Sequence, residues 1–144
     1  MNDFTFKSPT KLIFGRNTET LSGENVKAFG GTCVLIHYGS ERVKKSGLMA
    51  RVEDSLASAG IRFVELGGVV PNPRLALVRE GIALCRREKV DFILAVGGGS
   101  VIDSAKAIAM GVPYALDVWN FYLEKDGKAL DVPNAALPIG AVLT

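Results

Sequence analysis

The sequence is poor in the residues that build metal and nucleophile sites. Its 144 residues include one histidine, His37, and two cysteines, Cys33 and Cys85. One imidazole cannot supply a cluster of histidine ligands, and no Cys-x-x-Cys pair occurs. A serine–histidine–acid triad would also have to use that single histidine. We therefore expect a packed or hydrogen-bonded His37 and two buried, reduced cysteines, in a chain that binds a ligand and supplies only half of a reactive site.

Net charge and long apolar runs are also scarce. The balance of 17 basic and 15 acidic residues gives a net charge of +2, which is too small to indicate nucleic acid or a membrane surface as a partner. No apolar run approaches the roughly 20 residues of a membrane span. The N-terminus has neither the basic region nor the apolar core of a signal peptide. We expect a cytoplasmic protein with one core, and the 48% hydrophobic content is typical of a compact α/β domain.

One stretch, residues 91–106, organises the rest of the chain. Its apolar run over residues 92–96 predicts a buried strand, three glycines follow, and helical spacing begins at Val101. Ser100 and Asp103 have the spacing of a capping box. A glycine turn that opens a helix exposes backbone N–H groups at the positive end of the helix dipole. The stretch therefore predicts a phosphate site, the alternative being a turn needed only for packing.

The remaining pattern predicts alternating strands and helices. Strands are expected over residues 33–37, 61–65 and 92–96, and helices over residues 21–29, 48–59, 75–89 and 101–111. This order predicts an α/β fold of Rossmann-like type, with a parallel sheet and helices on both faces. Residues 4–7 and 11–15 alternate across a Ser-Pro turn and predict an N-terminal β-hairpin or edge strands.

Beyond Gly111 the pattern is weaker. Residues 117–121 indicate one short helical turn, residues 124–128 contain an Asp-Gly turn, and residues 135–144 indicate a further strand. Because this strand finishes at the last residue, we expect the chain to be a truncated part of a longer protein.

Four motifs occur in the order that a known enzyme family has them. They are Pro9-Thr10-Lys11-Leu12-Ile13-Phe14-Gly15, Tyr38-Gly39-Ser40, Pro71-Asn72-Pro73 and Gly97-Gly98-Gly99-Ser100-Val101-Ile102-Asp103-Ser104-Ala105-Lys106. Together they resemble the iron-containing (group III) alcohol dehydrogenases. Residues 38–48 and 117–121 resemble the NAD(P)H-dependent butanol dehydrogenase and aldehyde reductase branch of that family.

The resemblance implies a two-domain enzyme whose first domain, residues 1–144, binds the nicotinamide dinucleotide. A helical second domain would hold a divalent metal, iron or zinc, through an aspartate and three histidines that lie beyond Thr144. The full-length enzyme would move a hydride between NAD(P)H and a primary alcohol/aldehyde pair such as butanol and butanal, whereas this chain alone is expected to be inactive. A homodimer is also expected, because helix surfaces or the aromatic side chains near Trp119 would be exposed.

Two alternatives stay open. One is another enzyme of the same superfamily, resembling glycerol dehydrogenase or dehydroquinate synthase. The other is a non-enzymatic nucleotide-binding module. A P-loop phosphotransferase is excluded, because no Gly-Lys-Ser/Thr follows the glycines.

The resemblance also assigns cofactor contacts. It places Gly98, Gly99 and Ser100 at the pyrophosphate and Asn72 beside the cofactor, and it matches Thr144 to the first threonine of a cofactor loop. For Asp103 it implies a contact near the nicotinamide end, with helix capping as the alternative.

The choice between NAD and NADP depends on the residues after the first parallel strand. NAD-dependent members typically carry an aspartate there, and this chain has the small, neutral Gly39 and Ser40. Nearby cations and a hydroxyl suit a 2′-phosphate, so NADP(H) is favoured over NAD(H). Glu41 would take the acidic part if the alignment is shifted by one residue.

Overall fold

The centre of the fold is a four-stranded parallel sheet. The computed structural model describes residues 8–125, 128–129 and 135–144. In the order in which they pair, the strands of this sheet are β2 (Arg62–Leu66), β1 (Cys33–Tyr38), β3 (Phe92–Gly97) and β6 (Ile139–Leu143). All three pairings are parallel, so the four strands end at one common edge. The predicted α/β fold with a parallel sheet is confirmed.

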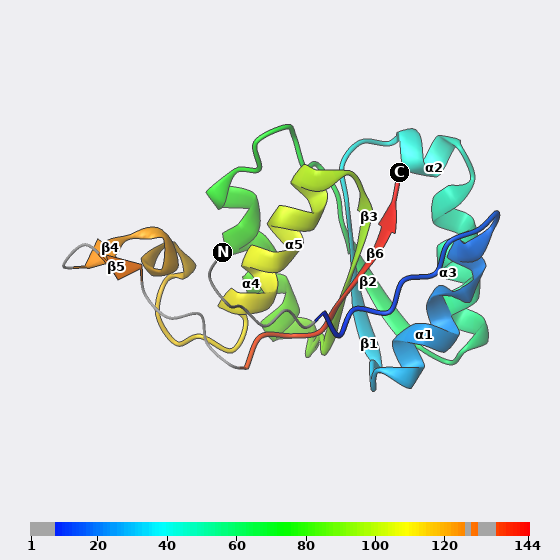
Figure 1. Cartoon of the computed structure of the whole chain (residues 1–144), viewed down its shortest axis with the longest axis horizontal. Helices are drawn as coiled ribbons and strands as arrows, with labels where there is room; N and C mark the ends of the chain where they lie inside the picture. Colours follow the sequence, from blue (N-terminus) through cyan, green and yellow to red (C-terminus); the bar gives the residue numbers. More distant parts are fainter. Residues whose placement is uncertain (1–7, 126–127, 130–134) are drawn as a thin grey trace, which may run out of the picture.

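Helices cover both faces of this sheet (Figure 1), which is why the central strands β1 and β3 are buried along their whole length and apolar except at His37. Helices α1 (Ser22–Ala28) and α3 (Leu48–Ser58) cover one face, and α4 (Leu75–Glu88) and α5 (Gly99–Gly111) cover the other. Side chains alternate between the two cores. Val34, Leu94 and Val96 pack toward α1 and α3, whereas Leu35 and Ile93 pack toward α4 and α5.

Three of these helices are followed by a residue with a left-handed backbone conformation. Gly30 after α1 and Gly60 after α3 have φ values of 83° and 74°, a region in which glycine is unstrained. Lys89 takes the same role after α4, with φ 56°. The predicted helix stops at Gly30 and Gly60 are thus confirmed.

Short elements connect the layers. They are η1 (Thr18–Leu21), α2 (Arg42–Lys45), η2 (Val118–Tyr122) and the antiparallel pair β4 (Glu124–Lys125) and β5 (Lys128–Ala129). The helical turn predicted over residues 117–121 corresponds to η2, where Asp117 accepts a hydrogen bond from the Trp119 amide. None of the described helices has the length and apolar character needed to cross a bilayer.

Two local predictions are wrong. Residues 11–15 form no strand: the backbone there has no sheet partner within the described residues, and Leu12 and Phe14 are 87% and 98% exposed. A strand needs a neighbouring backbone for its N–H and C=O groups, and this segment is instead attached by the Lys11 ammonium, 2.6 Å from the Asn25 side chain. Residues 4–7, the other half of the predicted hairpin, lie outside the described residues. Ser100 does not cap α5. The helix begins at Gly99, and its N-cap residue is Gly98.

Candidate functional site

The ends of the parallel strands bring the predicted site residues to one edge of the sheet. Gly39 and Ser40 follow β1, Asn72 lies in the loop after β2, Gly98 follows β3, and Thr144 follows β6. In Figure 1 this edge carries α2 and the C-terminus. Ligands of open parallel sheets bind outside the carboxyl ends of the strands. The topology therefore places these residues at the edge where such folds bind ligands.

The glycine turn after β3 is open where a ligand would approach. A Cβ atom added at Gly98 or at Gly99 would meet no heavy atom within 4 Å, and neither residue has a left-handed backbone. Gly97 differs, since its φ is 157° and a Cβ there would lie 2.6 Å from Val101 Cγ2. Packing therefore explains why residue 97 is glycine. It does not explain why residues 98 and 99 are glycines. Small residues at two open positions suit a ligand that touches the backbone.

Helix α5 directs its amino end at this open turn. The Gly98 carbonyl accepts hydrogen bonds from the amides of Val101 and Ile102, at 3.0 and 3.2 Å. The amides of Gly99 and Ser100 precede these donors and have no intrahelical acceptor. At 13 residues the helix is long enough for a full dipole at its end. This arrangement favours an anion, and phosphate is the anion that such helix starts most often bind in parallel α/β folds.

Two further predicted residues lie against the same turn. The Thr144 amide donates a hydrogen bond to the Gly97 carbonyl, at 3.3 Å, which extends the β3–β6 ladder by one residue. A Cβ added at Gly39 would lie 3.7 Å from Val101 Cγ2 and 3.3 Å from the Val69 carbonyl oxygen. Gly39 thus lies close to the first turn of α5. The structure brings Gly39, Thr144 and the glycine turn together.

Ser40 and Asn72 are exposed in the loops that follow β1 and β2. The Ser40 hydroxyl accepts a long hydrogen bond, 3.4 Å, from the Arg42 amide at the start of α2. Asn72 has φ 58°, a left-handed conformation that asparagine tolerates better than most residues. Its backbone conformation is therefore one sufficient reason for asparagine between the two prolines.

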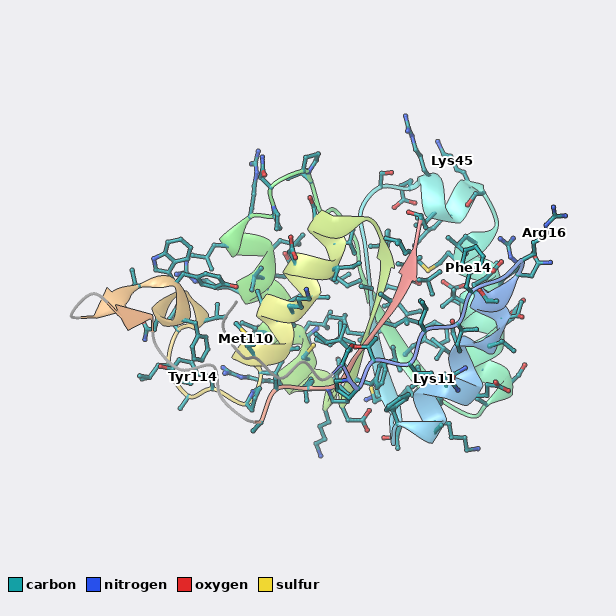
Figure 2. All side chains as sticks on the ribbon, viewed as in Figure 1. Lys11, Phe14, Arg16, Lys45, Met110 and Tyr114 are labelled. Carbon is teal, nitrogen blue, oxygen red and sulfur yellow. The ribbon has the colours of Figure 1, made fainter. Side chains whose placement is uncertain are left out.

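Asp103 borders a cleft lined by residues of α4, α5 and η2. It is exposed on α5 and makes no ion pair or side-chain hydrogen bond within the described residues, so the capping alternative is wrong. The cleft has a volume of about 540 Å³ and runs along α5 toward η2. Its wall is largely apolar and includes Val78, Met110 and Trp119. Figure 2 shows the labelled Met110 on this side of the sheet.

His37 does not face the candidate site. It is fully buried between β1 and α5, where Nδ1 lies 2.8 Å from the Leu66 carbonyl oxygen and Nε2 lies 2.8 Å from the Ser104 hydroxyl. Burial is the main cause that lowers the pKa of His37, so the ring is neutral near pH 7. The prediction of a hydrogen-bonded core histidine is confirmed. Both cysteines are free and buried, as predicted.

The described residues hold no group of three or more histidine, cysteine or carboxylate side chains arranged to bind a metal ion. The resemblance places the ligands of the divalent metal beyond Thr144, so this finding neither supports nor contradicts it.

The sequence did not identify two contacts that shape this edge. One is the His37–Ser104 pair, which two polar residues on otherwise apolar faces could have indicated. The other is an ion pair in which the Lys44 ammonium lies 2.7 Å from Glu65 Oε2. Lys44 also lies over the ring of Tyr38, 5.1 Å from its centroid. No sequence spacing links Lys44 to Glu65, because the pairing follows from how α2 lies beside β2.

Comparison with known proteins identifies similar sequences. The family described as iron-containing alcohol dehydrogenase matches residues 9–144. The chain is 46% identical, over 144 residues, to the probable NADH-dependent butanol dehydrogenase 1 of Bacillus subtilis, covering all of this chain and 36% of that protein. It is 38% identical to the NADPH-dependent aldehyde reductase YqhD of Escherichia coli, of which it also covers 36%. The chain thus spans about a third of the length of these relatives.

Solved structures agree with the fold. The NADH-dependent butanol dehydrogenase A of Thermotoga maritima superposes with a TM-score of 0.92 at 44% identity, covering all of this chain and 35% of that one. The iron-containing alcohol dehydrogenase of Thermococcus thioreducens superposes with a TM-score of 0.83 at 26% identity, covering 96% of this chain and 36% of that one.

Proposed function

The chain belongs to the iron-containing alcohol dehydrogenase family, and we propose that it is the nicotinamide dinucleotide-binding domain of such an enzyme. The observation that supports this most strongly is the open glycine turn, where positions 98 and 99 face no protein atom and α5 begins. Residues 1–144 would form this domain, and a further domain would hold the metal. The whole enzyme would interconvert a primary alcohol and its aldehyde, as the names of the relatives indicate for those proteins.

In this proposal the backbone of the chain holds the cofactor. The amides of Gly99 and Ser100 would donate to the pyrophosphate, and Gly98 would let the phosphates approach closely. Gly39 and Ser40 would lie beside the adenosine ribose, because β1 neighbours β3 in the sheet. Asn72 and Thr144 would border the cofactor from the adjoining strand ends. The bound cofactor would supply the hydride, and this chain would orient it and exclude water from one side.

The cleft beside Asp103 would receive the reactive end of the cofactor and the substrate. Its apolar wall suits the alkyl chain of a primary alcohol or aldehyde such as butanol or butanal. Asp103 is positioned at its border with its carboxylate unpaired within the described residues. This placement supports the role near the nicotinamide end that the family resemblance implies for Asp103.

The preference between the two cofactors stays a prediction. Ser40 and the exposed cations of α2 favour NADP(H), as the sequence does. Four of the similar proteins are named as NADH-dependent, one as an NADPH-dependent aldehyde reductase and one as an NADP-dependent alcohol dehydrogenase, so the names of the relatives do not decide the cofactor. The homodimer expected from the sequence also stays a prediction.

A binding experiment with one substitution tests the proposal. We expect calorimetric titration of the chain to detect binding of NADH or NADPH. The Gly99→Leu substitution should abolish that binding without unfolding the protein. An added Cβ atom at Gly99 meets no neighbouring atom, so lost binding in a Gly99→Leu variant that still folds would report ligand exclusion. Ala57→Leu, at an exposed position of α3, is the matched control. Unchanged affinity in Gly99→Leu would place the cofactor elsewhere and overturn the proposal.

A further inference from the structure

The positive charge of Lys44 is paired with a carboxylate of the same chain. Its ammonium lies 2.7 Å from Glu65 Oε2, and the side chains are 39% and 30% exposed. Oε2 is buried, and Lys44 is the cation paired with it. Glu65 is the first cause that raises the pKa of Lys44, with Tyr38 second, which means that the ammonium stays charged and attracted to the carboxylate.

The surroundings fix this pair in place. Tyr38 is the last residue of β1 and is 6% exposed, and Lys44 lies across its ring. A Cβ atom added at Gly67 would lie 2.5 Å from the Tyr38 ring, so the loop after β2 also packs against this ring. The cation therefore lies over the side chain of Tyr38, the residue that precedes Gly39 and Ser40 in the chain.

A second carboxylate adds negative charge. Glu53 of α3 lies near Glu65, and its pKa is raised first by burial and then by the charge of Glu65. Any further anion that approaches Lys44 must compete with Glu65 and is repelled by it.

NADPH differs from NADH by one such anion, the 2′-phosphate on the adenosine ribose. In the proposed function, on which this inference rests, that ribose lies at the end of β1. We propose that Glu65 is a specificity-determining residue, which occupies Lys44 and so lowers the affinity for NADPH relative to NADH. Arg42 and Lys45, by contrast, form no ion pair within the described part of the chain. Figure 2 shows the labelled Lys45 pointing away from the protein.

The test compares dissociation constants for NADH and NADPH at low salt. Glu65→Gln keeps the size of the side chain and frees Lys44, so NADPH should gain about two- to fivefold over NADH, the range that a partly exposed charge pair supports. Lys44→Met added to Glu65→Gln should remove that gain. The matched control is Glu88→Gln, which breaks the Arg62 pair at the other end of β2 and should leave the ratio unchanged.

Lys44→Met alone gives a second test that does not require a carboxylate change. Because Glu65 already occupies Lys44, this variant should alter the NADPH/NADH ratio by less than about twofold. A loss of NADPH affinity beyond about fivefold would mean that Lys44 already binds the phosphate, and it would overturn the inference.

Other outcomes are equally decisive. If Glu65→Gln binds NADH and the ratio stays unchanged, or if both affinities shift together, the pair is only structural and the inference is wrong. A gain that survives the Lys44→Met double variant also overturns it. If the unmodified chain binds neither cofactor at millimolar concentration, the proposed function fails first, and the two failures are thereby distinguished.

Discussion

The imidazole of His37 and the hydroxyl of Ser104 are hydrogen-bonded at 2.8 Å in the buried layer between β1 and α5. Because the Leu66 carbonyl can only accept, His37 Nδ1 carries the proton and Nε2 accepts from Ser104. One ring therefore connects β1, β2 and the second turn of α5. That helix is the one whose amino end borders the open glycine turn, so the pair fixes the position of the candidate site.

Stability should depend on pH through His37. Its pKa is lowered in the folded state, mainly by burial, whereas the unfolded chain has an ordinary pKa near 6.5. The unfolded state therefore takes up the proton first, and stability is lost as pH falls below about 6.5. Urea unfolding at pH 7.5 and pH 5.5 should show a lower free energy at pH 5.5. His37→Leu should flatten this dependence, and a steep dependence in that variant would refute the assignment.

Glycines of this chain should separate into two classes. A Cβ at Gly23 would lie 2.1 Å from the Ser55 carbonyl oxygen, a backbone atom that cannot turn aside, so Gly23→Ala should destabilise by about 2 kcal/mol or more. Gly99→Ala meets no atom and should change stability by less than about 1 kcal/mol. Thermal and urea unfolding measure both variants. Equal destabilisation would mean that the turn is packed after all.

Asp91 should anchor the start of the sheet. Its carboxylate accepts from the amides of Thr32 and Cys33, each at 2.9 Å. Burial alone would raise the pKa of Asp91, but the hydrogen bonds from Thr32 and Cys33 outweigh it and lower the pKa. The contribution is present above the unfolded pKa near 3.9 and disappears as pH falls through the folded value.

Asp91→Ala should therefore cost about 1–3 kcal/mol at pH 7 and much less at acid pH. Urea titrations at the two pH values measure the difference. Asp54→Ala, at an exposed position of α3, is the control and should cost little.

The two thiols should be inert while the protein is folded. Burial raises the pKa of Cys85 to about 12 and also raises the pKa of Cys33. Since only thiolates react quickly, a disulfide reagent at pH 8 should label the native protein slowly and consume two thiols after denaturant is added. Immediate labelling of the native protein would contradict the buried placement.

The sequence was sufficient for the layers of the fold, because apolar runs such as residues 92–96 and glycine stops such as Gly60 are local signals. It was also sufficient to collect Gly39, Gly98 and Thr144 at one edge, since parallel strands end together. It was insufficient where the structure depends on which groups pair with one another. Ser100 had the spacing of a cap, yet the Gly98 backbone starts the helix, and residues 11–15 had the pattern of a strand without a partner.

The open turn also has a consequence for how such a protein changes over generations. Most contacts in the proposed site come from main-chain amides and from residues without long side chains. A peptide group is the same in every sequence, so mutation can block this part of the site but can hardly retune it. Changes in cofactor preference should therefore occur at charged side chains such as Lys44 and Glu65, where one substitution removes a charge.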